Sequence, residues 1–236
     1  SVVVNDRWAK FSDGKKHGDY YTREYSANDA VFDKPWEECR GMGFSFGYNQ
    51  NEDLEDYATP QALILTLVNI VSKGGNLLLD IGPTANGKIP PIMQERLSQM
   101  GEWLKINGEA IYGTRRWKHV DQWSSGDRNW KYNGKYYVSG NAILKQTVDP
   151  DPGYAVQEVF FTSKGDNIYA ILPKYLKSIV LKDIYSTSQT KISLLGCDKE
   201  VEWKQEKDHI RITMPFLSFE ELSCNYAWTL KLEKVK

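Results

Sequence analysis

A short apolar run between turn-forming residues is the centre of the hydrophobic pattern in the first half of the chain. Residues 77–81 read Leu-Leu-Leu-Asp-Ile, after a Gly-Gly pair and before a Gly-Pro pair. Such a run indicates a strand that is buried on both faces. We therefore expect a buried strand over Asn76–Ile81.

Apolar residues with helical spacing lie on both sides of this strand. Residues 60–73 and 91–107 each place their apolar side chains on one helix face. These side chains are Leu63, Leu67, Ile70 and Val71 in the first segment, and Met93, Leu97, Met100 and Leu104 in the second. The order helix, buried strand, helix is typical of a parallel α/β sheet.

The residues at the segment ends also indicate helices. Thr59 is a capping residue, and Pro60 follows it at the first helical position, where its missing N–H costs no hydrogen bond. Lys73 and Gly74 give a basic last turn and a glycine suited to the position after the helix. A Pro-Pro pair begins the second helix, and an Asn-Gly pair ends it.

Two further strands are expected upstream, over Val2–Asp6 and Glu37–Arg40. Residues 9–34 show no sustained periodicity, so we expect a long loop there. Loops longer than about 15 residues in a compact domain are usually functional or disordered. The carboxyl ends of the three strands should meet at one face, where α/β folds bind ligands.

The first part of the chain is too short for a complete (β/α)8 barrel. Such a barrel takes about 250 residues, or roughly 31 for each βα unit. We therefore expect residues 1–115 to be the C-terminal part of a barrel. The sequence starts inside an expected strand and without an initiator methionine, which indicates a fragment or a processed piece.

The second part of the chain has short strand patterns at regular spacing. Residues 210–214, for example, alternate as Ile-Arg-Ile-Thr-Met. We expect strands at Val156–Thr162, Asn167–Leu172, Ser178–Ile184, Lys191–Leu195, Glu200–Gln205, His209–Met214 and Ala227–Leu232. This pattern predicts an antiparallel β-sandwich over residues 153–236, able to fold alone around its own core. Residues 116–152, rich in Gly, Asp, Asn and Pro, are expected to be a connector.

Composition narrows the function classes. The chain has 30 basic and 31 acidic residues and a formal net charge of −1, so nothing in its charge favours nucleic acid or an anionic membrane. No apolar stretch approaches the roughly 20 residues that span a bilayer. Cys39, Cys197 and Cys224 are too few and too scattered for a disulfide framework or a metal cluster, and we expect no cofactor.

Four segments together resemble the α-L-fucosidases of glycoside hydrolase family 29. They are Val-Val-Asn-Asp-Arg-Trp (3–8), Trp-Glu-Glu-Cys-Arg-Gly-Met-Gly-Phe-Ser-Phe-Gly-Tyr-Asn (36–49), Gly-Gly-Asn-Leu-Leu-Leu-Asp-Ile-Gly-Pro (74–83) and Gly-Glu-Trp-Leu-Lys-Ile-Asn-Gly-Glu-Ala-Ile-Tyr-Gly-Thr (101–114). The resemblance covers nearly all of the chain. It implies part of a retaining exo-α-L-fucosidase that hydrolyses terminal α-L-fucose from glycans.

The resemblance also implies which residues act. Retaining hydrolysis needs a carboxylate nucleophile and a general acid that later acts as base. In the family the nucleophile is an aspartate in a Trp-Asn-Asp-like motif, and this sequence contains no such motif. We therefore expect the chain to be inactive alone. The general acid matches Glu24, and Glu37 and Glu38 are its competitors.

Two further matches concern the sugar. Arg7 matches a residue that binds fucose near its ring oxygen and the nucleophile, with a structural ion pair as the alternative. Phe46 matches an aromatic that packs on the C6 methyl, with core packing as the alternative. His17 lies in a Lys-His-Gly-Asp stretch that resembles other family members, and contact with a leaving group is one interpretation, with a surface histidine as the favoured alternative.

Other functions remain open at this point. The sandwich alone fits a carbohydrate-binding module that uses Trp203, Trp228 or Tyr226 as a stacking platform, or a structural domain that braces the barrel. The expected partners are a fucosylated glycan and the missing N-terminal half of the barrel. A homo-oligomer through the exposed first strand is the alternative to that half. The expected location is extracytoplasmic, in a bacterial periplasm or secreted, with a signal upstream of this segment.

Overall fold

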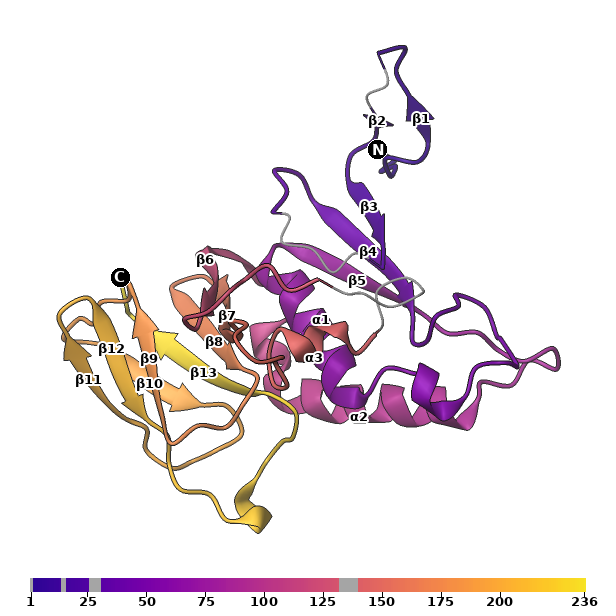
Figure 1. Cartoon of the computed structure of the whole chain (residues 1–236). Coiled ribbons are helices and arrows are strands. Elements are labelled where there is room, and N and C mark those ends of the chain that lie inside the picture. Colours follow the sequence, from indigo (N-terminus) through magenta and orange to yellow (C-terminus); the bar gives the residue numbers. More distant parts are fainter. Residues whose placement is uncertain (1, 14–15, 26–30, 132–139) are drawn as a thin grey trace.

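A computed structural model describes residues 2–13, 16–25, 31–131 and 140–236 of the chain. The described residues form a small parallel sheet, a helical layer, two larger antiparallel sheets and a two-stranded antiparallel ribbon (Figure 1). The helices are η1 (Leu54–Asp56), α1 (Pro60–Ser72), α2 (Pro91–Asn107), η2 (Gly108–Ala110), α3 (Ala142–Lys145) and η3 (Phe219–Glu221). Within the described residues, no helix is both long and apolar enough to cross a bilayer.

The parallel sheet has the order β3-β4-β5, with β3 at Tyr21–Glu24, β4 at Trp36–Gly41 and β5 at Gly75–Asp80. Both pairs of strands are parallel, so their carboxyl ends lie at the same edge. This confirms the strands expected at Glu37–Arg40 and Asn76–Ile81.

The expected strand at Val2–Asp6 is wrong except for one contact. Asn5 forms a single parallel bridge with Tyr20, just before β3. Val2 and Val3 are exposed, because no described element covers them. Their apolar side chains therefore have nothing to pack against, and no ladder forms.

The expected long loop over residues 9–34 contains strands. Besides β3, the described residues form a two-stranded antiparallel ribbon of β1 (Ala9–Lys10) and β2 (Lys16–His17). These strands are two to four residues long, too short to show a period of two. β3 is stabilised by pairing with β4, which the local sequence does not reveal.

Helix α1 has the predicted bounds to within one residue, but the prediction of a single apolar face is wrong. The Thr59 hydroxyl accepts a hydrogen bond from the Ala62 amide at 3.2 Å, and Gly74 takes a left-handed φ of 81° after the helix end. The buried residues surround the helix: Ala62, Leu63, Ile64, Leu65, Thr66, Val68, Ile70 and Ser72. Because α1 contacts β5 on one side and β6 and β7 on the other, it is buried between two sheets.

Helix α2 has the predicted bounds, and its buried side includes Met93, Met100 and Trp103. Leu97, expected on this face, is 39% exposed. The apolar stripe therefore turns around the helix toward Trp103, whose indole donates a hydrogen bond to the Ala227 carbonyl at 2.8 Å.

Strand β5 is covered on one face only, which corrects the prediction of burial on both faces. Leu79 packs against the cluster that contains α1. Asn76 is exposed, and Leu78 is 50% exposed. The apolar run therefore has an open side in the chain as described.

The predicted antiparallel β-sandwich is confirmed. All seven expected strands are present: β7 (Gln157–Lys164), β8 (Asn167–Leu172), β9 (Ser178–Lys182), β10 (Lys191–Leu194), β11 (Glu202–Glu206), β12 (His209–Thr213) and β13 (Trp228–Glu233). They form a five-stranded sheet with the order β10-β13-β8-β7-β6 and a three-stranded sheet with the order β11-β12-β9. The inner core joins side chains of both sheets, such as Phe161 and Leu230 with Leu181 and Ile210.

Strand β6 (Arg115–Trp123) lies in the segment expected as a connector. It pairs with β7, with irregular register between Arg116 and Asp121. The mixed charges and aromatics of this strand hid its alternation. The outer face of the same sheet packs Phe160, Tyr169 and Ile171 against the cluster of α1 and α2, so this sheet is covered on both sides.

Candidate functional site

A chain of hydrogen bonds at the carboxyl end of β3 joins four polar side chains. The Arg7 guanidinium donates from Nε to the Thr22 hydroxyl at 2.8 Å and from Nη1 to Glu24 Oε1 at 2.5 Å. The Thr22 hydroxyl donates to Asp6 Oδ1 at 2.7 Å. The Thr22 backbone N–H also donates to this oxygen, at 2.9 Å. The sequence thus brings two predicted site residues, Arg7 and Glu24, into direct contact.

Solvent exposure differs between the two ends of this hydrogen-bond network. Asp6 and Thr22 are 4% and 7% exposed. The side chains of Arg7 and Glu24 are 50% and 45% exposed. An ion pair this exposed contributes at most about 1 kcal/mol to stability. The pair therefore contributes little to holding the fold together, and both side chains are open to contact from outside.

Strand register places other groups on the same face as Glu24. Partners in a parallel pair share a face: Thr22 is opposite Glu37, Glu24 is opposite Cys39, and Cys39 is opposite Leu78. Burial raises the pKa of the Cys39 thiol, and the carboxylates of Asp80, Glu37 and Glu24 raise it further, while Arg7 acts in the opposite direction. The open face of the sheet therefore combines three carboxylates with one guanidinium.

Glu38, the other competitor for the general acid, lies on the opposite face of β4. It is buried, and its Oε1 is 3.5 Å from Arg40 Nη1. Burial lowers the pKa of the Arg40 guanidinium, opposed by Glu38. Of the two neighbouring glutamates, only Glu37 is on the face of Glu24.

Tyr25 connects this edge of the sheet to Phe46. Its φ of 45° is left-handed, so the chain turns sharply after Glu24. Its hydroxyl accepts a hydrogen bond from the Gly41 amide at 2.9 Å, and its ring meets Phe46 edge-on with centroids 5.0 Å apart. Burial raises the pKa of this phenol. Arg7 and Phe46 therefore lie at the same end of the sheet, and the role of each stays a prediction.

The remaining predicted residues lie elsewhere. His17 is exposed in the β1–β2 ribbon, with its ring 5.2 Å from that of Phe11. Trp203 and Trp228 pack against the sandwich core. Among the described residues, no group of three or more His, Cys, Asp or Glu side chains is arranged to hold a metal ion.

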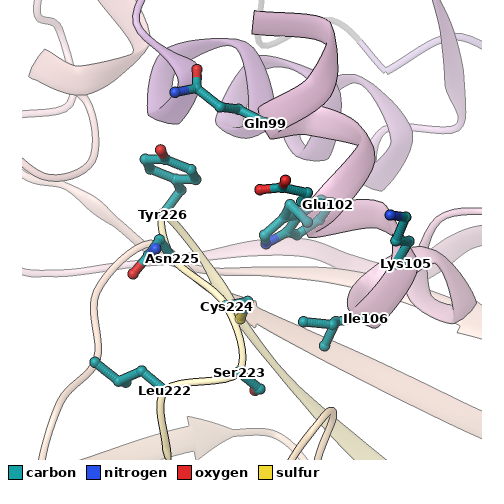
Figure 2. A pocket seen from close by; sticks show the side chains of 10 residues that line it. Gln99, Glu102, Lys105, Ile106, Leu222, Ser223, Cys224, Asn225 and Tyr226 are labelled. Carbon is teal, nitrogen blue, oxygen red and sulfur yellow. The ribbon is translucent and has the colours of Figure 1, made fainter. Parts of the chain in front are cut away.

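Tyr226 lies at a separate hollow between α2 and the loop before β13 (Figure 2). This hollow has a volume of about 370 Å³. Its walls include Gln99, Glu102 and Asn225, and Figure 2 shows the Tyr226 ring facing Gln99 across it. It shares no lining residue with the Arg7–Glu24 contact.

Sequence reasoning did not single out Thr22 or Tyr25, and it considered Asp6 only as a fallback nucleophile, not as a partner of Thr22. A signal was present for Thr22, because it lies two residues before Glu24 and so on the same face of a strand. That signal needed the strand β3, which the sequence did not indicate.

Two family models match the chain. The model described as alpha-L-fucosidase matches residues 1–109, and the model described as alpha-L-fucosidase C-terminal domain matches residues 154–233. The first matched range holds Arg7, Glu24 and Phe46, and the second holds most of the sandwich.

Curated relatives align along the whole chain. A plasma alpha-L-fucosidase of Rattus norvegicus is 38% identical over 243 residues, and a tissue alpha-L-fucosidase of Homo sapiens is 37% identical over 240 residues. Both alignments cover 100% of this chain, but 46% and 45% of the relatives. The chain thus spans about half the length of the curated relatives it matches.

Solved structures give the same picture. An alpha-fucosidase of Thermotoga maritima, in complex with a mechanism-based inhibitor, superposes with a TM-score of 0.70 at 32% identity. The match covers 98% of this chain and 45% of that one. Alpha-L-fucosidase isoenzyme 1 of Paenibacillus thiaminolyticus also reaches 0.70, at 21% identity, which speaks for the fold alone.

Proposed function

This chain belongs to the α-L-fucosidase family, and we propose that it forms the C-terminal part of a retaining exo-α-L-fucosidase that removes terminal α-L-fucose from glycans. The observation that carries this proposal is the Arg7–Glu24 contact at the carboxyl edge of a parallel sheet. This edge is where α/β barrels place their catalytic side chains.

The proposed fold of the first part is the end of a (β/α)8 barrel. The parallel order β3-β4-β5 and the cover of α1 on one face support it. The open face supports it as well, because Leu78 is half exposed there beside three carboxylates. Further strands would enclose this face and turn it into a barrel interior.

In the proposed mechanism Glu24 first protonates the leaving oxygen and then activates water as a general base. A retaining enzyme needs its second carboxyl group about 5–5.5 Å away. We propose that an aspartate outside this chain supplies that nucleophile. Arg7 donates a hydrogen bond to Glu24 from one guanidinium nitrogen, and its positive charge is proposed to lie between the two carboxyl groups.

Phe46 is proposed to contact the apolar side of the sugar. It is half-buried and rests on Tyr25, one residue after Glu24. An aromatic face fixed in this way suits the C6 methyl of fucose. The sandwich is proposed to brace the barrel through the shared layer of α1 and α2.

Turnover of an aryl α-L-fucoside tests the proposal. We expect turnover from the longer protein that contains this chain, with the released fucose first appearing as the α-anomer. We expect none from the purified 236-residue chain, because one of the two required carboxyl groups is missing. A longer protein without activity, or one that inverts the anomer, would contradict the proposed function. Turnover by the short chain would show that one of its own carboxylates acts as nucleophile.

A further inference from the structure

The hydrogen bonds behind Arg7 point to two residues whose task is to position it. We propose that Asp6 and Thr22 hold the Arg7 guanidinium in the orientation that meets Glu24, and that they are positioning residues for the reaction. The inference rests on the proposed function for its role in catalysis, and on the hydrogen bonds alone for the positioning.

The direction of each hydrogen bond follows from the chemistry of the groups. Arg7 Nε only donates, so the Thr22 oxygen must accept from it. A hydroxyl has a single proton, and Thr22 uses it to donate a hydrogen bond to Asp6 Oδ1. Asp6 Oδ1 accepts from both the backbone N–H and the hydroxyl of Thr22, so it fixes the hydroxyl with its lone pairs toward Arg7. The donors therefore point in one direction, from Arg7 to Thr22 and from Thr22 to Asp6.

The backbone fixes both ends of this arrangement. Thr22 and Glu24 are two residues apart on β3, so their side chains leave the same face. Asp6 and Arg7 are adjacent in the sequence, and the Asn5–Tyr20 bridge holds their segment beside β3. One strand thus binds two different nitrogens of one guanidinium, Nε through Thr22 and Nη1 through Glu24.

Two bonds from one strand restrict the guanidinium in a way that one bond does not. With Glu24 alone, the half-exposed Arg7 side chain would pivot about a single contact. The bond to the buried Thr22 hydroxyl holds the other side of the guanidinium, in a place that water reaches poorly. Polar groups held before the substrate arrives stabilise developing charge without reorganising, which is a large part of electrostatic catalysis.

The first test measures positioning without activity. The Nε–H signal of Arg7, followed by heteronuclear NMR in the 236-residue chain or the longer protein, should be protected from exchange with water. The change Thr22→Val removes the hydroxyl and keeps both the branched shape and the backbone N–H bond to Asp6. We expect the Nε–H signal to disappear through exchange in Thr22→Val and to persist in Thr22→Ser. An Nε–H signal equally protected in Thr22→Val would overturn the proposal.

The second test uses a double-mutant cycle in the longer protein. Thr22→Val should lower kcat on a fucoside by about 10- to 100-fold, the range for one lost hydrogen bond to a charged group. Its KM should change little, and Thr22→Ser should recover most of the rate. In an Arg7→Ala background Thr22→Val should cost nothing more, because its effect passes through Arg7.

Two outcomes of this cycle separate the possible failures. A full loss from Thr22→Val in the Arg7→Ala background would show a structural role and overturn the positioning. Should Thr22→Val fold poorly, Asp6→Ala in the same cycle gives the same discrimination, because it removes the oxygen that accepts from the Thr22 hydroxyl. A wild-type protein with no fucosidase activity would end the proposed function, while the NMR test would still decide whether Asp6 and Thr22 hold Arg7.

Discussion

Glu24 lies at the end of a strand that is paired with β4, so the sheet and not a loop sets its position. In the longer protein, Glu24→Ala should lower hydrolysis of natural fucosides by about 10²–10⁴-fold, the usual contribution of a positioned general acid. Aryl fucosides with good leaving groups should suffer less, because they need little protonation. Added azide should partly restore turnover, since it attacks the glycosyl-enzyme without a general base.

Glu37→Ala is the matched control for this change, because Glu37 lies on the same open face, opposite Thr22. It should lower the rates of both substrate classes to a similar extent, and azide should not restore them. If Glu24→Ala behaved in this way and Glu37→Ala showed the rescue, the general acid would be Glu37.

A second residue-scale prediction concerns pH and Glu109. Its Oε1 accepts hydrogen bonds from Lys231 Nζ and from the Tyr169 hydroxyl, both at 2.7 Å. The bond from Lys231 and then that from Tyr169 lower the pKa of Glu109. Burial and Glu109 together raise the pKa of Tyr169 to about 12. A carboxyl group whose pKa is lower in the folded state stabilises the fold above its unfolded pKa of 4.5. This contribution to stability is lost as the pH falls from that value through the lower, folded-state pKa.

Urea unfolding of wild type and Glu109→Gln at pH 7 and pH 3 tests the direction of this pH dependence of stability. We expect the variant to be less stable at pH 7 by up to about 1 kcal/mol, since the pair is partly exposed. At pH 3 the difference in free energy of unfolding should shrink, because the wild type then begins to lose the negative charge of Glu109, which the variant lacks at any pH. A constant difference at both values would mean that the Glu109 charge contributes nothing.

At the scale of elements, β5 begins at a glycine that a neighbouring side chain requires. A Cβ at Gly75 would lie 2.4 Å from the indole of Trp36, which is buried and bonded through Nε1 to the Lys73 carbonyl at 3.3 Å. Gly75→Ala should therefore destabilise the chain by about 1–3 kcal/mol, the usual cost of overpacking. Thermal unfolding measures the change.

Gly101→Ala is the matched control, because it adds the same methyl group within helix α2. Apart from its chain neighbours and the helix's own backbone, no heavy atom of the described residues lies within 4 Å of a Cβ at that position. Alanine should stabilise the helix by up to about 1 kcal/mol relative to glycine. If both changes moved stability in the same direction, the Trp36 contact would not be what requires glycine at position 75.

The elements that the sequence predicted correctly are those with strong local signals. Both long helices had prolines at their starts, the first with Thr59 as a cap, and turn signals separated the seven sandwich strands, two of which alternate cleanly. β3 and β6 were missed, because both owe their conformation to a partner strand distant in sequence. The site shares this limit: Arg7, Glu24 and Phe46 came from family motifs, while the contact between Asp6 and Thr22 became visible only once β3 placed them together.

At the scale of the whole chain, we expect the sandwich to be less independent than its strand pattern indicates. Its five-stranded sheet includes β6, and the outer face of that sheet packs Phe160, Tyr169 and Ile171 against helices. A fragment of residues 153–236 would lose β6 and expose these three side chains to water. We therefore expect this fragment to self-associate and to unfold without a sharp transition, unlike the whole chain.

Sedimentation and circular dichroism of this fragment check the prediction. A fragment of residues 109–236 is the matched control, because it restores β6 while still lacking α1 and α2. It should be intermediate in stability and in association. A monomeric 153–236 fragment with a cooperative transition would show that the inner core suffices and that the sandwich is a domain of its own.

Helix α1 has sheets on two sides and caps that satisfy its ends, with consequences for how the molecule opens. We expect its backbone amides to exchange with deuterium only when one of the two sheets separates from it. These amides should thus be the slowest to exchange, at a rate set by global unfolding. The β1–β2 ribbon, which shares little surface with the rest, should exchange within the dead time. Opening of the β1–β2 ribbon then leaves the centre of the molecule closed.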